Sequence, residues 1–128
     1  MKKKAINSSY FAHSNAPYSH GILMNGMVFT TQIGETEDGS VISEDVYEQT
    51  KQTIENAERI IKEAGGTLED VCKVTIYMLD MKNDFDKMNR AYRELMPNDP
   101  FPARACVQVG GMIEGVKVKM EFTAFVGA

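Results

Sequence analysis

The chain has 128 residues, of which 43% are hydrophobic and 25% are charged, so it can bury a core within one compact domain. Its formal net charge of −4 argues against a dedicated nucleic-acid binder, because such proteins normally present a basic surface to phosphates. We therefore expect a single domain over residues 1–128 and no nucleic-acid partner.

The two cysteines argue for a reducing compartment. Cys72 and Cys106 are far apart in sequence and each lies in an apolar, strand-like run, which does not fit a disulfide framework or a metal cluster. No apolar run approaches the roughly 20 residues of a membrane span. The N-terminal lysines precede Ala-Ile-Asn-Ser-Ser rather than the apolar segment of a signal peptide. We expect reduced thiols, no membrane contact and a cytoplasmic location.

The first third of the chain predicts short strands. Lys4-Ala5-Ile6 is a possible edge strand, and GILMN (residues 21–25) and MVFTTQI (residues 27–33) have strand composition. Asn25-Gly26 between these two runs is the strongest hairpin signal in the chain. The segment GETEDGS that follows, residues 34–40, is polar and glycine-containing and predicts a solvated turn.

A helix is expected from Val46 to the Gly65-Gly66 pair. Ser43 can cap its start, Glu44 and Asp45 suit the positive end of the helix dipole, and the glycines end it. One face of this helix carries apolar or small residues with helical spacing, which predicts burial of that face. These residues are Val46, Thr50, Thr53, Ile54, Ala57, Ile60, Ile61 and Ala64.

The second half predicts a strand, a helix and two more strands. VCKVTIYML (residues 71–79) is a strand, and a second helix begins near Asn83 and Asp84 and ends before Pro97. ARACVQV (residues 103–109) and VKVKMEFTAFV (residues 116–126) alternate as strands. The apolar stripe of the second helix consists of Phe85, Met88, Tyr92, Leu95 and Met96.

The order β-β-β-α-β-α-β-β favours an α+β fold. A mixed sheet with both helices on one face buries the two apolar stripes against a common surface. In the last two strands, small and apolar residues such as Ala105 and Met120 are expected under the helices. The opposite face is then expected to hold Arg104, Cys106, Gln108, Lys119 and Glu121.

The uncovered face of this sheet cannot be purely polar. Residues 27–33 and 71–79 carry apolar side chains on both faces of each strand. A sheet that is apolar on its uncovered side predicts burial against another subunit, and hence a homo-oligomer.

The run Pro102-Ala103-Arg104-Ala105-Cys106-Val107 carries a family resemblance. Together with Pro17-Tyr18 ahead of Gly21, with Gln32 and with Asn89, it resembles the reactive intermediate deaminase family (RidA, formerly YjgF, also called endoribonuclease L-PSP). The resemblance spans nearly the whole chain. It implies a chorismate-mutase-like fold and a homotrimer with a central barrel and three ligand clefts between subunits. It also implies hydrolysis of 2-imino acids and their enamine tautomers to 2-oxo acids and ammonia, without metal or organic cofactor.

The resemblance also implies roles for single residues. Arg104 matches the arginine that holds the substrate carboxylate, a role that suits the planar guanidinium fork. An interface salt bridge to an acid such as Glu121 is the alternative. The Cys106 side chain is expected to be a small buried residue rather than a nucleophile, because no histidine is near it in sequence. The residues that match the family cleft, beside Arg104, are Tyr18, Thr30, Asn89 and Cys106.

Three departures affect the catalytic role. Active family members carry a water-orienting glutamate fifteen residues after the arginine, where this chain has Lys119. Glu121 lies about 6.5 Å further along the strand and replaces that glutamate only if the altered Gly111-Met112-Ile113 turn shifts the register. Thr31 stands where the family has glycine, which adds a β-branched side chain beside the cleft.

Lys119 has several possible roles. It neutralises Glu121 or another interface acid, it adds a second cation beside Arg104 for a dianionic ligand, or it acts as a base. His20 is another group near the cleft that could transfer protons. The leading hypothesis is deamination of a small carboxylate-bearing imine or enamine. The alternative is a trimer that binds or senses small carboxylates, including 2-oxo acids, with lost or altered catalysis. RNA cleavage has little support in an acidic chain without paired histidines.

Overall fold

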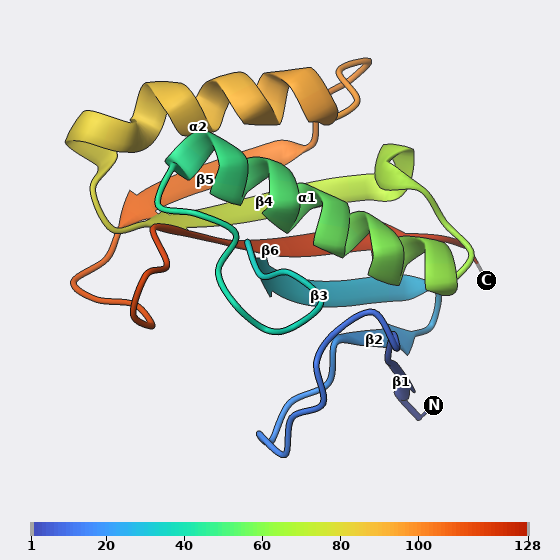
Figure 1. The fold of residues 1–128 in the computed structure, drawn as a ribbon. Coiled ribbons are helices and arrows are strands. Elements are labelled where there is room, and N and C mark those ends of the chain that lie inside the picture. Colours follow the sequence, from blue (N-terminus) through green and yellow to red (C-terminus); the bar gives the residue numbers. More distant parts are fainter. Residues whose placement is uncertain (1, 128) are drawn as a thin grey trace.

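The computed structural model describes residues 2–127, which form one six-stranded mixed sheet and two α-helices (Figure 1). The strands are β1 (Lys4–Ile6), β2 (Gly21–Met24), β3 (Met27–Ile33), β4 (Val71–Met78), β5 (Ala103–Gln108) and β6 (Val118–Phe125). The helices are α1 (Val46–Glu63) and α2 (Met81–Leu95), and a short 3₁₀ helix, η1 (Leu68–Asp70), precedes β4. The predicted α+β class and element order are confirmed.

The strand order across the sheet is β1-β2-β3-β6-β4-β5. The pair β4 and β5 is parallel and joined through α2, whereas every other neighbouring pair is antiparallel. Both helices lie on the same side of the sheet (Figure 1). Between them and the sheet lies the core, whose largest fully buried apolar side chains are Phe122, Ile54, Ile60, Ile61, Ile76, Met78, Met88 and Met120. No helix within residues 2–127 is long and apolar enough to cross a membrane.

The β2–β3 hairpin forms where Asn25-Gly26 predicts it. Met24 pairs with Met27, and the two loop residues have φ values of 53° and 79°. This left-handed pair is the geometry of a two-residue turn that matches the twist of the strands, and asparagine and glycine tolerate it best. β1 is the short edge strand expected at Lys4–Ile6.

The helix starts differ from the prediction in which residue caps them. Asp45, not Ser43, is the N-cap of α1, and its carboxylate accepts a hydrogen bond from the Glu48 N–H at 3.1 Å. Asp80, not Asn83 or Asp84, caps α2. In both cases the nearest acid before the first helical residue can reach an unpaired N–H of the first turn, and its charge suits the helix dipole. Gly65, at a φ of 94°, follows the C-terminus of α1 as expected.

The predicted face of β5 is wrong. Arg104 pairs in register with Val74, and Cys106 pairs with Ile76, and both partners are fully buried under the helices. Arg104 and Cys106 therefore lie on the helix side of the sheet, while Val107 lies on the uncovered side and is 44% exposed. The prediction failed because β5 is an edge strand beside α2, where a long arginine side chain can lie over aromatic rings and still reach solvent.

The assignment of β6 is correct. Val118, Met120, Phe122 and Ala124 are buried under the helices, and Lys119 and Glu121 alternate onto the uncovered side. Arg104 and Lys119 consequently lie on opposite faces of the sheet, not on one face as the sequence suggests. The uncovered face is partly apolar, as expected, because Phe29 and Phe125 are 46% and 52% exposed.

Candidate functional site

Arg104 borders a small cavity of about 180 Å³ between α2 and the segment leading into β5. The Asn89 Oδ1 accepts a hydrogen bond from the Arg104 Nη1 at 2.7 Å. The guanidinium carbon lies 4.8 Å from the ring centre of Tyr92 and 5.9 Å from that of Phe85, within the range of cation–π attraction. We call this the Arg104 cavity; its lining residues are Asn89, Tyr92, Arg93, Phe101, Pro102 and Arg104.

The guanidinium is fixed on one side and open on the other. Asn89 and the two aromatic rings come from successive turns of α2, so helix geometry sets the orientation of the Arg104 fork. Arg104 remains exposed and forms no ion pair among residues 2–127, so its remaining N–H donors are available to an anion. Within one chain Arg104 and Glu121 form no salt bridge, because these residues lie on opposite faces of the sheet. An interface salt bridge between Arg104 and an acid of another copy stays a prediction.

Burial around Arg104 keeps its neighbours uncharged. Burial raises the pKa of the Cys106 thiol, and the nearby Arg104 charge opposes this only in part. Burial likewise raises the pKa of Tyr92, whose hydroxyl has no hydrogen-bond partner among the described residues. Cys106 is partly buried and packs against the core. A protonated, partly buried thiol is a poor nucleophile.

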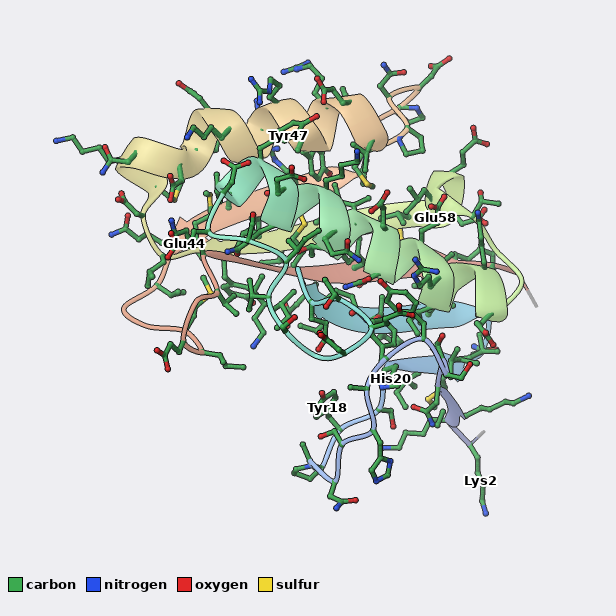
Figure 2. All side chains as sticks on the ribbon, in the orientation of Figure 1. Lys2, Tyr18, His20, Glu44, Tyr47 and Glu58 are labelled. Atoms are coloured by element: carbon green, nitrogen blue, oxygen red, sulfur yellow. The ribbon has the colours of Figure 1, made fainter. Side chains whose placement is uncertain are left out.

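A larger cavity of about 530 Å³ lies at the end of β3. β2 pairs with β3 only as far as Ile22 opposite Phe29, so the rest of this edge of β3 has no strand beside it. The loop that leads into β2 runs there and carries Tyr18 and His20 (Figure 2). We call this the Lys119 cavity; its lining residues are Tyr18, Ser19, His20, Ile22, Phe29, Thr30, Thr31, Gln32, Ile33, Glu35 and Lys119.

His20 anchors the loop that carries Tyr18. Its Nδ1 accepts a hydrogen bond from the Ser8 backbone N–H at 3.0 Å, and the His20 backbone N–H donates to the Asn7 Oδ1 at 3.2 Å. Burial lowers the pKa of His20, and an Nδ1 that accepts a hydrogen bond belongs to the neutral ring. These contacts support the loop-anchoring role of His20 over proton transfer through Nδ1.

Thr30 has a hydroxyl that is already engaged within the chain. It donates to the His20 carbonyl at 2.6 Å and accepts from the Gln32 Nε2 at 2.8 Å, and the side chain is buried. Thr31, on the opposite face of the same strand, is exposed into the Lys119 cavity. Of the two threonines, Thr31 is therefore the one with a hydroxyl free for a ligand.

Glu121 does not reach the Lys119 cavity. Its carboxylate accepts a hydrogen bond from the Tyr77 hydroxyl at 2.8 Å. The pairing of β6 with β3 runs without a break from Met27–Phe125 to Ile33–Lys119, so the turn before β6 introduces no shift of register there. Lys119, not Glu121, lines the cavity.

The residues expected in one cleft thus form two separate groups. Asn89 and Arg104 lie in the Arg104 cavity, above Cys106, on the helix side. Tyr18, Thr31 and Lys119, with the buried Thr30, line the Lys119 cavity beside β3 and β6 in the middle of the sheet order, and Glu121 lies in neither cavity. One chain does not bring the two groups together.

Two contributors were missed in the sequence. Tyr92 was recognised only as a core residue of the second helix, although its ring supports Arg104. Glu35 was placed in a solvated turn, although it lines the Lys119 cavity. Within residues 2–127 no group of three or more His, Cys, Asp or Glu side chains could hold a metal ion.

The sequence of this chain matches a known protein family and several of its members. The family model described as Endoribonuclease L-PSP matches residues 10–126. A RutC family protein of Pyrococcus abyssi is 39% identical over 127 residues, covering 98% of each chain. The 2-iminobutanoate/2-iminopropanoate deaminase of Salmonella typhimurium is 35% identical over 111 residues, covering 84% of this chain and 86% of that protein.

A solved structure agrees with these matches. The crystal structure of Escherichia coli TdcF with bound serine superposes with a TM-score of 0.85 at 30% identity, covering 95% of this chain and 98% of that chain. The chain therefore belongs to the reactive intermediate deaminase family, the RidA/YjgF group whose family model is described as Endoribonuclease L-PSP.

Proposed function

We propose that this protein hydrolyses small 2-imino acids and their enamine tautomers to 2-oxo acids and ammonia. The observation that carries the proposal is the Arg104 guanidinium, which Asn89 and the α2 aromatic rings hold in one orientation with its outer donors free. Such a fork suits a carboxylate next to a reacting imine carbon. The name of the Salmonella relative and the serine bound to TdcF support a small amino-acid-derived ligand.

In this proposal the reacting cleft forms between two copies of the chain. Arg104 of one copy holds the carboxylate, and the Lys119 cavity of the next copy surrounds the imine, with Tyr18 and Thr31 at its wall. Three copies related by a threefold axis close into a ring in which each supplies both halves. The apolar residues of the uncovered sheet face, including Phe29 and Phe125, then line the centre of the trimer. We also keep the cytoplasmic location as a prediction.

Sedimentation velocity tests the assembly at micromolar concentration. A species with three times the mass of the chain is expected, because the exposed apolar face favours association. A stable monomer would leave the two cavities in separate molecules and would remove the basis of a shared cleft.

Ammonia release tests the reaction itself. 2-Iminopropanoate and 2-iminobutanoate are generated in place by an amino acid oxidase with catalase, and ammonia is followed by a coupled assay. A rate clearly above that of solvent hydrolysis supports the proposal. A rate equal to the protein-free control, with retained binding of 2-oxo acids, favours the second candidate.

That second candidate is a trimer that binds or senses small carboxylates without hydrolysis. The observation that favours it is Lys119, which brings an ammonium group to the cavity at the position of the family glutamate. An ammonium cannot accept a proton from the attacking water. The candidate keeps Arg104 as the anchor and differs only in catalysis.

A further inference from the structure

We propose that Glu35 is the general base that activates water in the Lys119 cavity, in place of the glutamate that Lys119 replaces. The inference rests on the proposed function and adds a residue to it. Among the described residues that line this cavity, Glu35 supplies the one carboxylate. Hydrolysis of an imine needs a proton acceptor, so the position of this carboxylate decides whether the cavity can support the reaction.

The backbone of Glu35 is held in place by α1. Asn56, which is fully buried, donates hydrogen bonds from Nδ2 to the carbonyl oxygens of Ile33 at 3.0 Å and Glu35 at 2.9 Å. Gln52 donates to the Asn56 Oδ1 at 2.9 Å and fixes the orientation of that amide. Glu35 therefore belongs to a rigid segment against the helix, although it begins a polar loop.

Gly34 allows the chain to pass this close to α1. A Cβ atom at Gly34 would lie 2.8 Å from the Gln49 carbonyl oxygen and 2.9 Å from its Cα, both backbone atoms. No larger residue fits there without displacing the helix or the strand end. The close approach sets the direction in which the chain leaves β3 and brings Glu35 to the cavity wall.

The Glu35 side chain is available for chemistry. Among residues 2–127 its carboxylate takes part in no ion pair, and Glu121, by contrast, is occupied by Tyr77. Glu35 is half-buried, and burial raises its pKa above the ordinary value, in the direction that makes a carboxylate a better base. The other titratable groups at the cavity are Tyr18, His20 and Lys119, and Glu37 and Asp38 follow in the same loop.

The proposed step conserves atoms and charge. Water adds through oxygen to the imine carbon while Glu35 takes one of its protons and passes it to the imine nitrogen, which gives a carbinolamine. Glu35 then takes the hydroxyl proton and passes it to the same nitrogen, the C–N bond breaks, and ammonia leaves as the C=O bond forms. The carboxylate is regenerated, and no cofactor or redox partner is needed.

The test compares Glu35→Gln with Glu37→Gln in the whole protein. Glu37 is exposed, lies in the same loop and does not line the cavity, so it is a matched control. Loss of a general base predicts a fall in kcat of about 100-fold or more in Glu35→Gln. Glu37→Gln is expected to stay within about twofold of wild type, as for most surface changes.

Two further readouts separate a base from a structural residue. KM and the affinity for a 2-oxo acid should be unchanged in Glu35→Gln, because Arg104 supplies the anchor. The decline of the wild-type rate at acid pH should disappear from the residual rate of Glu35→Gln, whereas a decline caused by His20 would persist. The double variant Glu35→Gln/Lys119→Glu should regain the rate, because it returns a carboxylate to the cavity.

The outcomes distinguish this inference from the proposed function. An active wild type with an equally active Glu35→Gln, or a variant altered only in KM, overturns the role of Glu35 and leaves deamination standing. Equal losses in Glu35→Gln and Glu37→Gln show a loop effect and also overturn it. A wild type without activity overturns both. Retained 2-oxo acid binding in Glu35→Gln excludes misfolding as the cause of a lost rate.

Discussion

The replacement Arg104→Ala is the most direct test of the ligand site. It removes a guanidinium whose single side-chain hydrogen bond among residues 2–127, to Asn89 at 2.7 Å, orients it without satisfying its other donors. Truncating one partner of a charged hydrogen-bonded pair at a partly desolvated site costs about 2–5 kcal/mol of binding free energy. Because about 1.4 kcal/mol corresponds to a tenfold change, the Kd for a 2-oxo acid should rise from about 30-fold to several thousand-fold.

The fold should tolerate this change. Arg104 is exposed on an edge strand, and its contacts with Tyr92 and Phe85 are worth about 0.5–1 kcal/mol at such a position. The helical circular dichroism and the oligomer mass should therefore match those of wild type. Asn89→Ala should weaken binding by a smaller factor, since it loosens the guanidinium and leaves the charge in place.

Isothermal titration with 2-oxobutanoate measures the effect, with Arg90→Ala as the control. Arg90 lies on α2 and stacks on Tyr47 at 4.4 Å, so it has the same chemistry, but it does not line the Arg104 cavity. Equal affinities of wild type and Arg104→Ala would refute the reasoning and put the anchor elsewhere. Equal losses of affinity in Arg104→Ala and Arg90→Ala would show an effect of net charge and not a specific contact of the Arg104 guanidinium.

Three other predictions concern catalysis and stability. Lys119→Glu should raise the deamination rate, because it adds a carboxylate to the cavity. Glu121→Ala should leave the rate near that of wild type, because the Glu121 carboxylate is bound to Tyr77. A Glu121→Ala variant without activity would contradict the observed register of β6. Gln49→Ala should lower the unfolding free energy by about 3 kcal/mol in urea titrations, because this buried side chain makes three hydrogen bonds to Ser43, Gly115 and Lys117. Glu35→Gln should raise the Tm at pH 7, because burial raises the Glu35 pKa and so disfavours its charged form in the folded protein. The gain in Tm should vanish in thermal scans below pH 4.5, the ordinary pKa of a glutamate, where the wild-type side chain is uncharged in both the folded and the unfolded state.

Local sequence patterns predicted the helices and strands well, because interactions between residues close in sequence determine where these elements begin and end. The Asn25-Gly26 hairpin, the apolar stripe from Val46 and the end of α1 at Gly65 all follow from rules that involve a few neighbouring residues. The predicted caps lie two to four residues from the observed ones, since several polar residues lie near each helix start and only the backbone geometry selects one.

The arrangement of the site could not be predicted in the same way. Alternation in β5 gives two faces but does not say which one meets α2, and the small alanines suggested the wrong one. Contacts of Arg104 with Tyr92 and Asn89 decide it, and these depend on how a helix packs across an edge strand. The proposed role of Glu35 depends likewise on Asn56, a polar residue within the buried side of α1.

The same buried polar residues order the backbone at the end of β3, where the proposed base replaces a carboxylate on β6. A loop glutamate normally samples many orientations, and a base must be held within a fraction of an ångström to be useful. Here Asn56 binds the Glu35 carbonyl and Gly34 packs on the Gln49 backbone, so α1 orders the backbone from which the Glu35 side chain extends. In the proposed mechanism the carboxylate anchor on α2 and β5 is thus separate from the proton acceptor, and either can change while the other remains.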